Sequence, residues 1–171
     1  MNSRCIFNSL AVGGWNIQGV FEKIQASKIN KLDDPFFKSI LKQFDILRLQ
    51  ETHLSQDDII PEAKGYVPIP HCRVKSKNNR YFGGMIIYIK ASIRNGTNIR
   101  RTFDEDAFEV TLLKNFFGLR NDIKLLFTYA SPINSCYTKA RATNILDKIE
   151  THFIDGGNNF IVIGDLNGRK N

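Results

Sequence analysis

Two short runs of the chain are too uniformly apolar for a sheet with one wet face, and they limit the folds open to it. They are Ile123 to Tyr129 and Phe160 to Ile163. A strand with one wet face alternates apolar and polar residues, so these runs predict strands covered on both faces. Four more runs have a strand-like composition: Leu10 to Trp15, Asp45 to Gln50, Met85 to Ile89 and Phe108 to Leu113. Sheets covered by helices predict an α/β sandwich.

Two segments have the apolar spacing of helices. The first begins with Asp34 as N-cap and Pro35 at the first helical position, and ends near Phe44. Its core-facing residues are expected to be Phe36, Phe37, Ile40, Leu41 and Phe44. The second runs from about Tyr137 to Phe153 and ends before Gly156-Gly157, with its stripe at Ala142, Ile145, Leu146, Ile149 and Phe153.

The composition is that of one folded domain over residues 1–171, with 42% hydrophobic and 24% charged residues. The longest apolar run, Met85 to Ile89, is far below the roughly 20 residues that span a bilayer, and no signal peptide is recognisable. Three cysteines without a CxxC pair favour a reducing compartment, so we expect an intracellular protein. Asn95-Gly96 lies between strand-like runs and predicts a hairpin turn rather than a glycosylation site.

Positive charge is concentrated in one segment. The net charge is +7, and residues 63–103 contain nine basic residues and no Asp or Glu. Arg73, Lys75 and Lys77 alternate, so an extended strand would put them on one face, with Arg80 in the polar stretch that follows. Such a face suits the phosphates of a nucleic acid. A solvated basic surface without a partner is the alternative that charge alone leaves open.

Polar residues lie at or just after the ends of four predicted strands. They are Asn16, Glu51, Tyr129 and the pair Asp165 and Asn167. A strand end is a rigid position from which a side chain can act. Carboxylate and amide oxygens are hard donors of the kind that Mg²⁺ prefers, although each of these stretches alone also fits a plain turn.

Five motifs in this order make the chain resemble the endonuclease/exonuclease/phosphatase superfamily. They are Trp15-Asn16-Ile17-Gln18-Gly19, Leu49-Gln50-Glu51-Thr52-His53-Leu54, Gly83-Gly84, Tyr129-Ala130-Ser131-Pro132 and Ile163-Gly164-Asp165-Leu166-Asn167-Gly168-Arg169. Within it, the chain looks most like the endonuclease domain of non-LTR (LINE-type) retrotransposons, which nicks DNA and leaves a 3′ hydroxyl. The resemblance implies a four-layer α/β/β/α sandwich of the DNase I-like type.

The same resemblance implies a role for each motif residue. Glu51 would be the principal ligand of a Mg²⁺ ion, or Mn²⁺, and Asn16 would help place the metal and the scissile phosphate. Tyr129 would contact the scissile phosphate and Asp165 would orient or activate the attacking water. Asn167 would support the developing negative charge, and Arg169 would be a further phosphate contact. DNA is the implied partner, and a DNA substrate implies action in the nucleus.

The chain also departs from the family pattern. Gln18 stands where DNA-repair members carry an acid, and two residues rather than one separate Tyr129 from Pro132. The final Ser-Asp-His motif of the family has no counterpart, so we expect a domain that lacks its C-terminal strands and has impaired activity unless another chain or a downstream domain completes it. His53 is two residues from Glu51 and could lie near the site, but we expect a loop or strand-end histidine with a structural hydrogen bond. A nucleic-acid-binding remnant without catalysis, or a phosphoesterase acting on another ester, are the alternatives.

Overall fold

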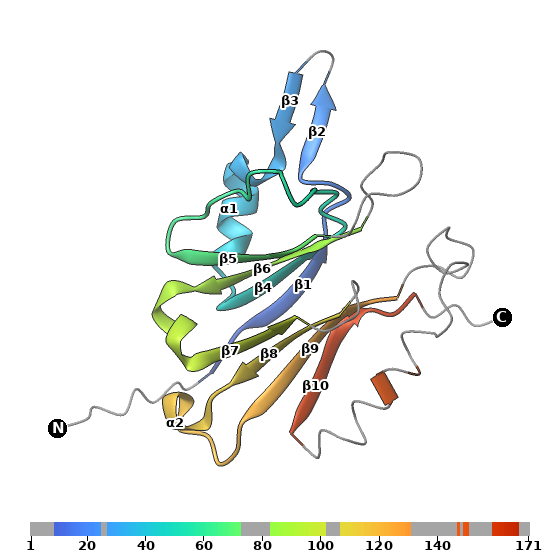
Figure 1. Ribbon diagram of the computed structural model, residues 1–171. Coiled ribbons are helices and arrows are strands. Elements are labelled where there is room, and N and C mark those ends of the chain that lie inside the picture. Colours follow the sequence, from blue (N-terminus) through green and yellow to red (C-terminus); the bar gives the residue numbers. More distant parts are fainter. Residues whose placement is uncertain are drawn as a thin grey trace. The chain divides into compact units, whose positions relative to one another are not determined.

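The described residues form a mixed α/β structure with two four-stranded sheets and few helices (Figure 1), which confirms the predicted fold class. The computed structural model describes residues 9–24, 27–72, 83–101, 107–130, 147, 149–150 and 159–167. The chain divides into two units. The first unit is Ile6–Asn95, and the second unit is Gly96–Asn171 together with Met1–Cys5.

The sheet of the first unit has the strand order β1-β4-β6-β5. Its strands are β1 (Val12–Asn16), β4 (Ile46–Gln50), β5 (Tyr66–His71) and β6 (Met85–Lys90). β1 and β4 are parallel, whereas β6 pairs antiparallel with both β4 and β5. A two-stranded hairpin, β2 (Phe21–Ile24) and β3 (Ser27–Asn30), is inserted after β1. Parallel pairing therefore brings the carboxyl ends of β1 and β4 to one edge of the sheet.

The predicted first helix is present as α1 (Pro35–Leu41), which follows the 3₁₀ turn η1 (Lys31–Asp33). The Asp34 carboxylate caps it by accepting from the Phe36 N–H at 2.7 Å. The helix ends three residues before the predicted end. Phe37 and Leu41 are buried against Leu47, Leu49, Ile86 and Tyr88 of the sheet. The prediction that Phe36 belongs to the core is wrong: it lies in the first turn and is 68% exposed.

The predicted hairpin turn at Asn95-Gly96 is also wrong. These residues end a 3₁₀ segment, η2 (Ala91–Gly96), between β6 and β7 (Thr97–Arg101). β6 already pairs with β4 on one side and β5 on the other, so neither edge is open to β7. β7 pairs instead with β8 (Ala107–Leu112) in the other sheet. The connection therefore leads from one sheet to the next.

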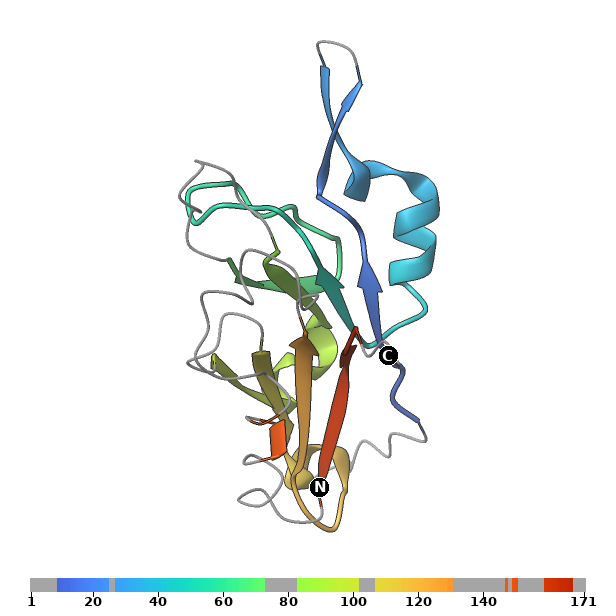
Figure 2. The same ribbon diagram turned by 90° about the vertical axis from the view of Figure 1, so that its right-hand side faces the viewer.

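The sheet of the second unit has the strand order β10-β9-β8-β7. β9 (Ile123–Tyr129) pairs antiparallel with β8 and parallel with β10 (Phe160–Asp165), and the two parallel strands run side by side in Figure 2. A short helix, α2 (Lys114–Phe117), joins β8 to β9 and ends at Gly118, which has a φ of 69°. This unit repeats the arrangement of the first: a parallel pair whose carboxyl ends meet at one edge.

The sequence predicts burial on both faces for two strands, and this is confirmed for β9, whose last five residues are buried. It is wrong for β10, which has one hydrogen-bonded neighbour among the described residues and whose Ile161 is 48% exposed. Among the other predicted strands, β4 is buried throughout and β6 over most of its length, whereas β1 is only partly buried. Three residues of the predicted second helix, Asp147, Ile149 and Glu150, are helical, and the rest of it lies outside the described residues. Ile149 packs on Leu126 and Ala130.

Within the described part of the chain, no helix is both long and apolar enough to cross a membrane.

The first unit should lose stability at alkaline pH. Burial raises the pKa of the Tyr88 hydroxyl, which donates to the Pro61 carbonyl at 2.7 Å, and the hydrogen bond to Asp45 raises the pKa of Lys90. Folding thus favours the protonated form of both groups. The two groups contribute to the free energy of unfolding at pH values below their pKa values in the unfolded chain, which are about 10 for both. This contribution is lost as the pH rises above those values.

We expect the melting temperature to fall as the pH rises from about 10 to about 12. In Tyr88→Phe the fall should be smaller, because one of the two groups no longer titrates. Circular dichroism melts across this range measure the effect. Equal alkaline sensitivity of wild type and Tyr88→Phe would contradict it.

Candidate active site

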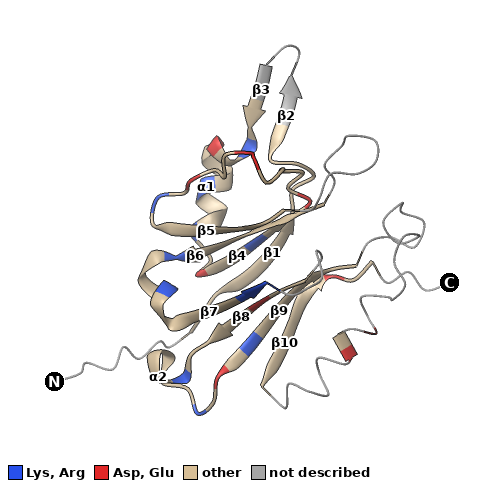
Figure 3. Ribbon diagram, in the orientation of Figure 1, with Lys and Arg blue, Asp and Glu red and all other residues tan. Residues whose placement is uncertain are grey.

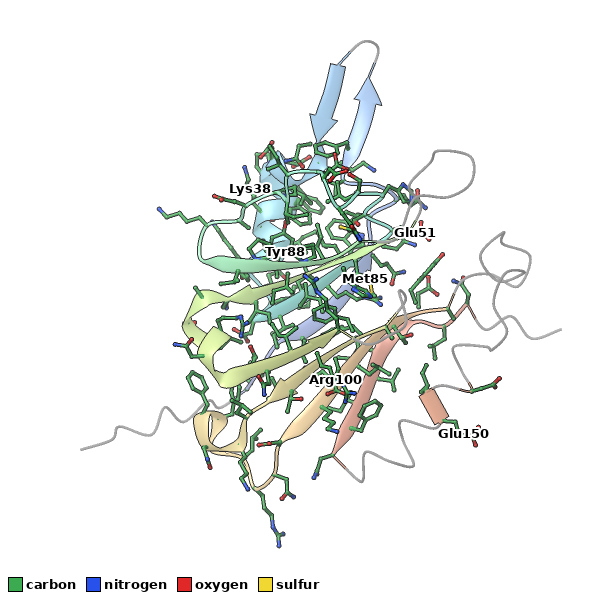
Figure 4. The ribbon with its side chains drawn as sticks, viewed as in Figure 1. Lys38, Glu51, Met85, Tyr88, Arg100 and Glu150 are labelled. Atoms are coloured by element: carbon green, nitrogen blue, oxygen red, sulfur yellow. The ribbon has the colours of Figure 1, made fainter. Side chains whose placement is uncertain are left out.

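Asn16 and Glu51 lie together at the carboxyl edge of the first sheet. Asn16 is paired with Gln50 in the parallel register, so Glu51 follows directly beside it. The Ile17 N–H donates to the Gln50 carbonyl at 3.2 Å, and the Gly19 N–H donates to the Glu51 carbonyl at 2.6 Å. Figure 4 shows Glu51 and Met85, the partner of Gln50 on β6, at the same edge. The pairing of β1 with β4 therefore continues into both loops.

The backbone after β4 is held in an unusual conformation. Glu51 and His53 have φ values of 54° and 55°, a left-handed region that non-glycine residues seldom adopt. The His53 N–H donates to Gly83 at 2.9 Å and the Thr52 N–H donates to Gly84 at 3.3 Å. Both glycines have φ above 70° themselves, which explains the Gly83-Gly84 motif in backbone terms. Positive φ at non-glycine residues often marks functional sites.

The loop after Asn16 is fixed by two further interactions. The Asn16 Oδ1 accepts from the Gln18 N–H at 3.1 Å, which orients the amide at the strand end. The Lys31 Nζ donates to the carbonyls of Ile17 at 3.0 Å and Gln18 at 3.2 Å. Sequence reasoning missed Lys31, since one lysine among many gives no signal. The His53 imidazole lies against Gly19, where an added Cβ would come within 3.3 Å of Nδ1.

A buried arginine supports the strand that carries Glu51. Arg48 is 2% exposed, and its guanidinium donates to the Oε1 of Gln50, which is equally buried. It also lies beside Gly14 of β1, whose missing side chain leaves it room. Sequence reasoning missed this residue too. The signal was present, because a single Arg inside an apolar strand has to be accommodated by a specific partner.

Tyr129, Asp165 and Asn167 form a second cluster at the carboxyl edge of the other sheet. Asp165 is paired with Tyr129 in the parallel register, and the Ala130 N–H donates to the Asp165 carbonyl at 2.9 Å. The Asp165 Oδ1 accepts from the Asn167 N–H at 3.1 Å, and the Asn167 Nδ2 donates to the Ala130 carbonyl at 2.7 Å. Asn167 has a φ of 43°. Its amide nitrogen carries a second proton, which is the donor that the expected support of the developing negative charge needs.

The structure thus brings the predicted residues together as two clusters, one in each unit. The predicted nucleic-acid-binding residues Arg73, Lys75, Lys77, Arg80 and Arg169 lie outside the described residues. Among the residues that are described, no group of three or more His, Cys, Asp or Glu side chains gathers as a metal site would.

The first cluster fits a divalent metal of the Mg²⁺ type. Glu51 supplies one carboxylate and Asn16 supplies one amide oxygen, both on fixed backbone. Mg²⁺ is commonly held by only one or two carboxylates, several waters and substrate phosphate. Glu51 and Asn16 would be the protein donors to such an ion, with waters and substrate phosphate completing its coordination.

Residues 13–170 match the model of the Endonuclease/Exonuclease/phosphatase family. The chain belongs to this family. Its members are hydrolases acting on phosphate esters and generally use divalent metals. No curated protein sequence matches the chain significantly.

A search of solved structures finds the human Nocturnin catalytic domain with bound sulfate anion. It is 18% identical in sequence, with a TM-score of 0.51, and the match covers 94% of this chain and 64% of that one. The likeness shows a shared fold, of the DNase I-like type that the sequence predicts. The chain spans about two thirds of the length of the Nocturnin domain, at 64%.

Gly164 should be necessary for the position of Asp165. An added Cβ there would collide with the carbonyl oxygen of Thr128 on β9. Gly164→Ala should therefore displace β10 and lower the free energy of unfolding by about 1–3 kcal/mol. Gly65→Asn is the control: its surroundings are open, and asparagine tolerates the φ of 86°. Equal urea denaturation midpoints for Gly164→Ala and wild type would contradict the assignment.

Proposed function

We propose that the chain is a Mg²⁺- or Mn²⁺-dependent DNA endonuclease domain that nicks its substrate, of the type found in LINE-type retrotransposons. The observation that carries the proposal is the pairing of Asn16 and Glu51 at neighbouring strand ends, with Glu51 held in a left-handed conformation. Family membership supports phosphate-ester hydrolysis. The retrotransposon-like motifs around Glu51 and Asp165 support DNA as the substrate.

Each residue has one part in the proposed reaction. Glu51 and Asn16 hold the metal, which when bound supplies positive charge to the scissile phosphate. The Tyr129 hydroxyl donates to a phosphate oxygen. The Asp165 carboxylate orients the attacking water and accepts its proton as the water oxygen bonds to phosphorus. The P–O3′ bond breaks, and the leaving 3′ oxygen takes up a proton from solvent. Asn167 donates its second amide proton to the developing charge. The products are a 3′ hydroxyl and a 5′ phosphate.

The charge of the chain supports a polyanionic substrate. Of the basic residues in segment 63–103, the structure describes Lys64, Lys90, Arg94, Arg100 and Arg101. Figure 3 shows described Lys and Arg residues spread over both units. Together with the net charge of +7 they favour association with phosphates, and this association should weaken steeply with salt.

A supercoiled-plasmid nicking assay tests the proposal. We expect Mg²⁺-dependent nicking that falls by about 10²–10⁴-fold in Glu51→Gln and in Asp165→Asn, because each removes a group acting at the reacting phosphate. Glu62→Gln is the matched control, since Glu62 is an exposed carboxylate away from the strand ends. Nicking that survives in Glu51→Gln would overturn the residue assignment. Salt-dependent DNA binding without any nicking would favour the non-catalytic alternative.

A further inference from the structure

A cavity of about 660 Å³ lies next to the candidate metal ligand Asn16. Its walls come from the end of β1, from β3, from η1 and from the first turn of α1, all within the first unit. Asn16 and Gln18 are part of its lining. A molecule bound in this cavity would therefore be next to any phosphate held at Asn16.

The cavity gathers exposed apolar side chains. Six large hydrophobic residues are exposed in the described part of the chain, and three of them, Trp15, Ile29 and Phe36, line this cavity. Trp15 is 36% exposed and stacks on Phe37 with ring centroids 5.7 Å apart and an interplanar angle of 22°. The stacking fixes the indole, so the cavity has a rigid aromatic surface.

The charged side chains that line the cavity already form hydrogen bonds or ion pairs within the protein. The Asp34 carboxylate caps α1, and Asp33 forms an ion pair with Lys38 at 3.7 Å. The Lys31 ammonium holds the carbonyls of Ile17 and Gln18. The remaining polar lining is mainly amide: Asn16, Gln18 and Asn30 each carry both donors and acceptors. The cavity thus combines a flat apolar surface with neutral hydrogen-bonding groups.

We propose that this cavity takes one unpaired nucleobase of the substrate strand, next to the phosphate held at Asn16. The inference rests on the proposed function. A nucleobase has an apolar face that stacks on an aromatic ring and an edge that pairs with amide groups. An enzyme can take a base out of the duplex into such a pocket, at the lowest energy where the base is already unpaired.

The single tryptophan of the chain makes the test direct, because a base stacked in the cavity quenches Trp15 emission. The probes are a short single-stranded DNA and a DNA of equal length with abasic residues at its centre, both without added metal. We expect quenching by the first and little by the second. Phe36→Ala should weaken the affinity for the first by about tenfold. Ile59→Ala, at another exposed apolar side chain outside the cavity, should leave the affinity unchanged.

Equal quenching by the two DNAs, or equal affinities of Phe36→Ala and Ile59→Ala, would overturn the nucleobase assignment. Because Phe36 is 68% exposed, its replacement should leave the fold intact, which circular dichroism checks. If Glu51-dependent nicking persists while the base has no effect on Trp15, the inference fails and the proposed function stands. If base-dependent quenching occurs without nicking, the proposed function fails. The cavity is then a nucleobase site in a protein that does not cleave DNA.

Discussion

Parallel pairing of two strands is the constraint on which both clusters depend. β1 with β4, and β9 with β10, are the parallel pairs of the two sheets. In each, the last paired residues carry the candidate chemistry: Asn16 beside Gln50, and Asp165 beside Tyr129. Backbone hydrogen bonds set this register, so the side chains are positioned by the sheet rather than by flexible loops.

The loops that follow the two parallel pairs share one hydrogen-bond motif. In each, the oxygen of a strand-end side chain accepts from an N–H two residues later, from Gln18 in one and from Asn167 in the other. All non-glycine residues with positive φ in the described chain fall in the family motifs: Gln18, Glu51, His53 and Asn167. Each such residue costs about 1–3 kcal/mol, which the buried strands beside it offset. A site strained in this way needs little rearrangement when substrate binds.

The sequence allowed the prediction of elements whose burial leaves a clear pattern. Six strands and α1 were predicted, as were the strand-end residues, because apolar runs and a capped helix are local signals. The edge strand β5 was missed: Pro68 and Pro70 argue against a strand, yet an edge strand tolerates prolines on its outer side. β7 is polar, and it too lies at an edge. The contacts of Lys31 depend on the tertiary structure and leave no local pattern. Arg48 was missed although a single Arg inside an apolar strand is a local signal.

The claim that Asn16 and Glu51 hold a divalent metal is tested most directly by NMR with substoichiometric Mn²⁺, which broadens amide signals near the bound ion. We expect broadening at Asn16, Gln18 and Glu51, with signals around Asp45 at the opposite end of β4 unaffected. The broadening should disappear in Glu51→Gln and remain in Glu62→Gln. Broadening centred elsewhere, or unchanged in Glu51→Gln, would contradict it.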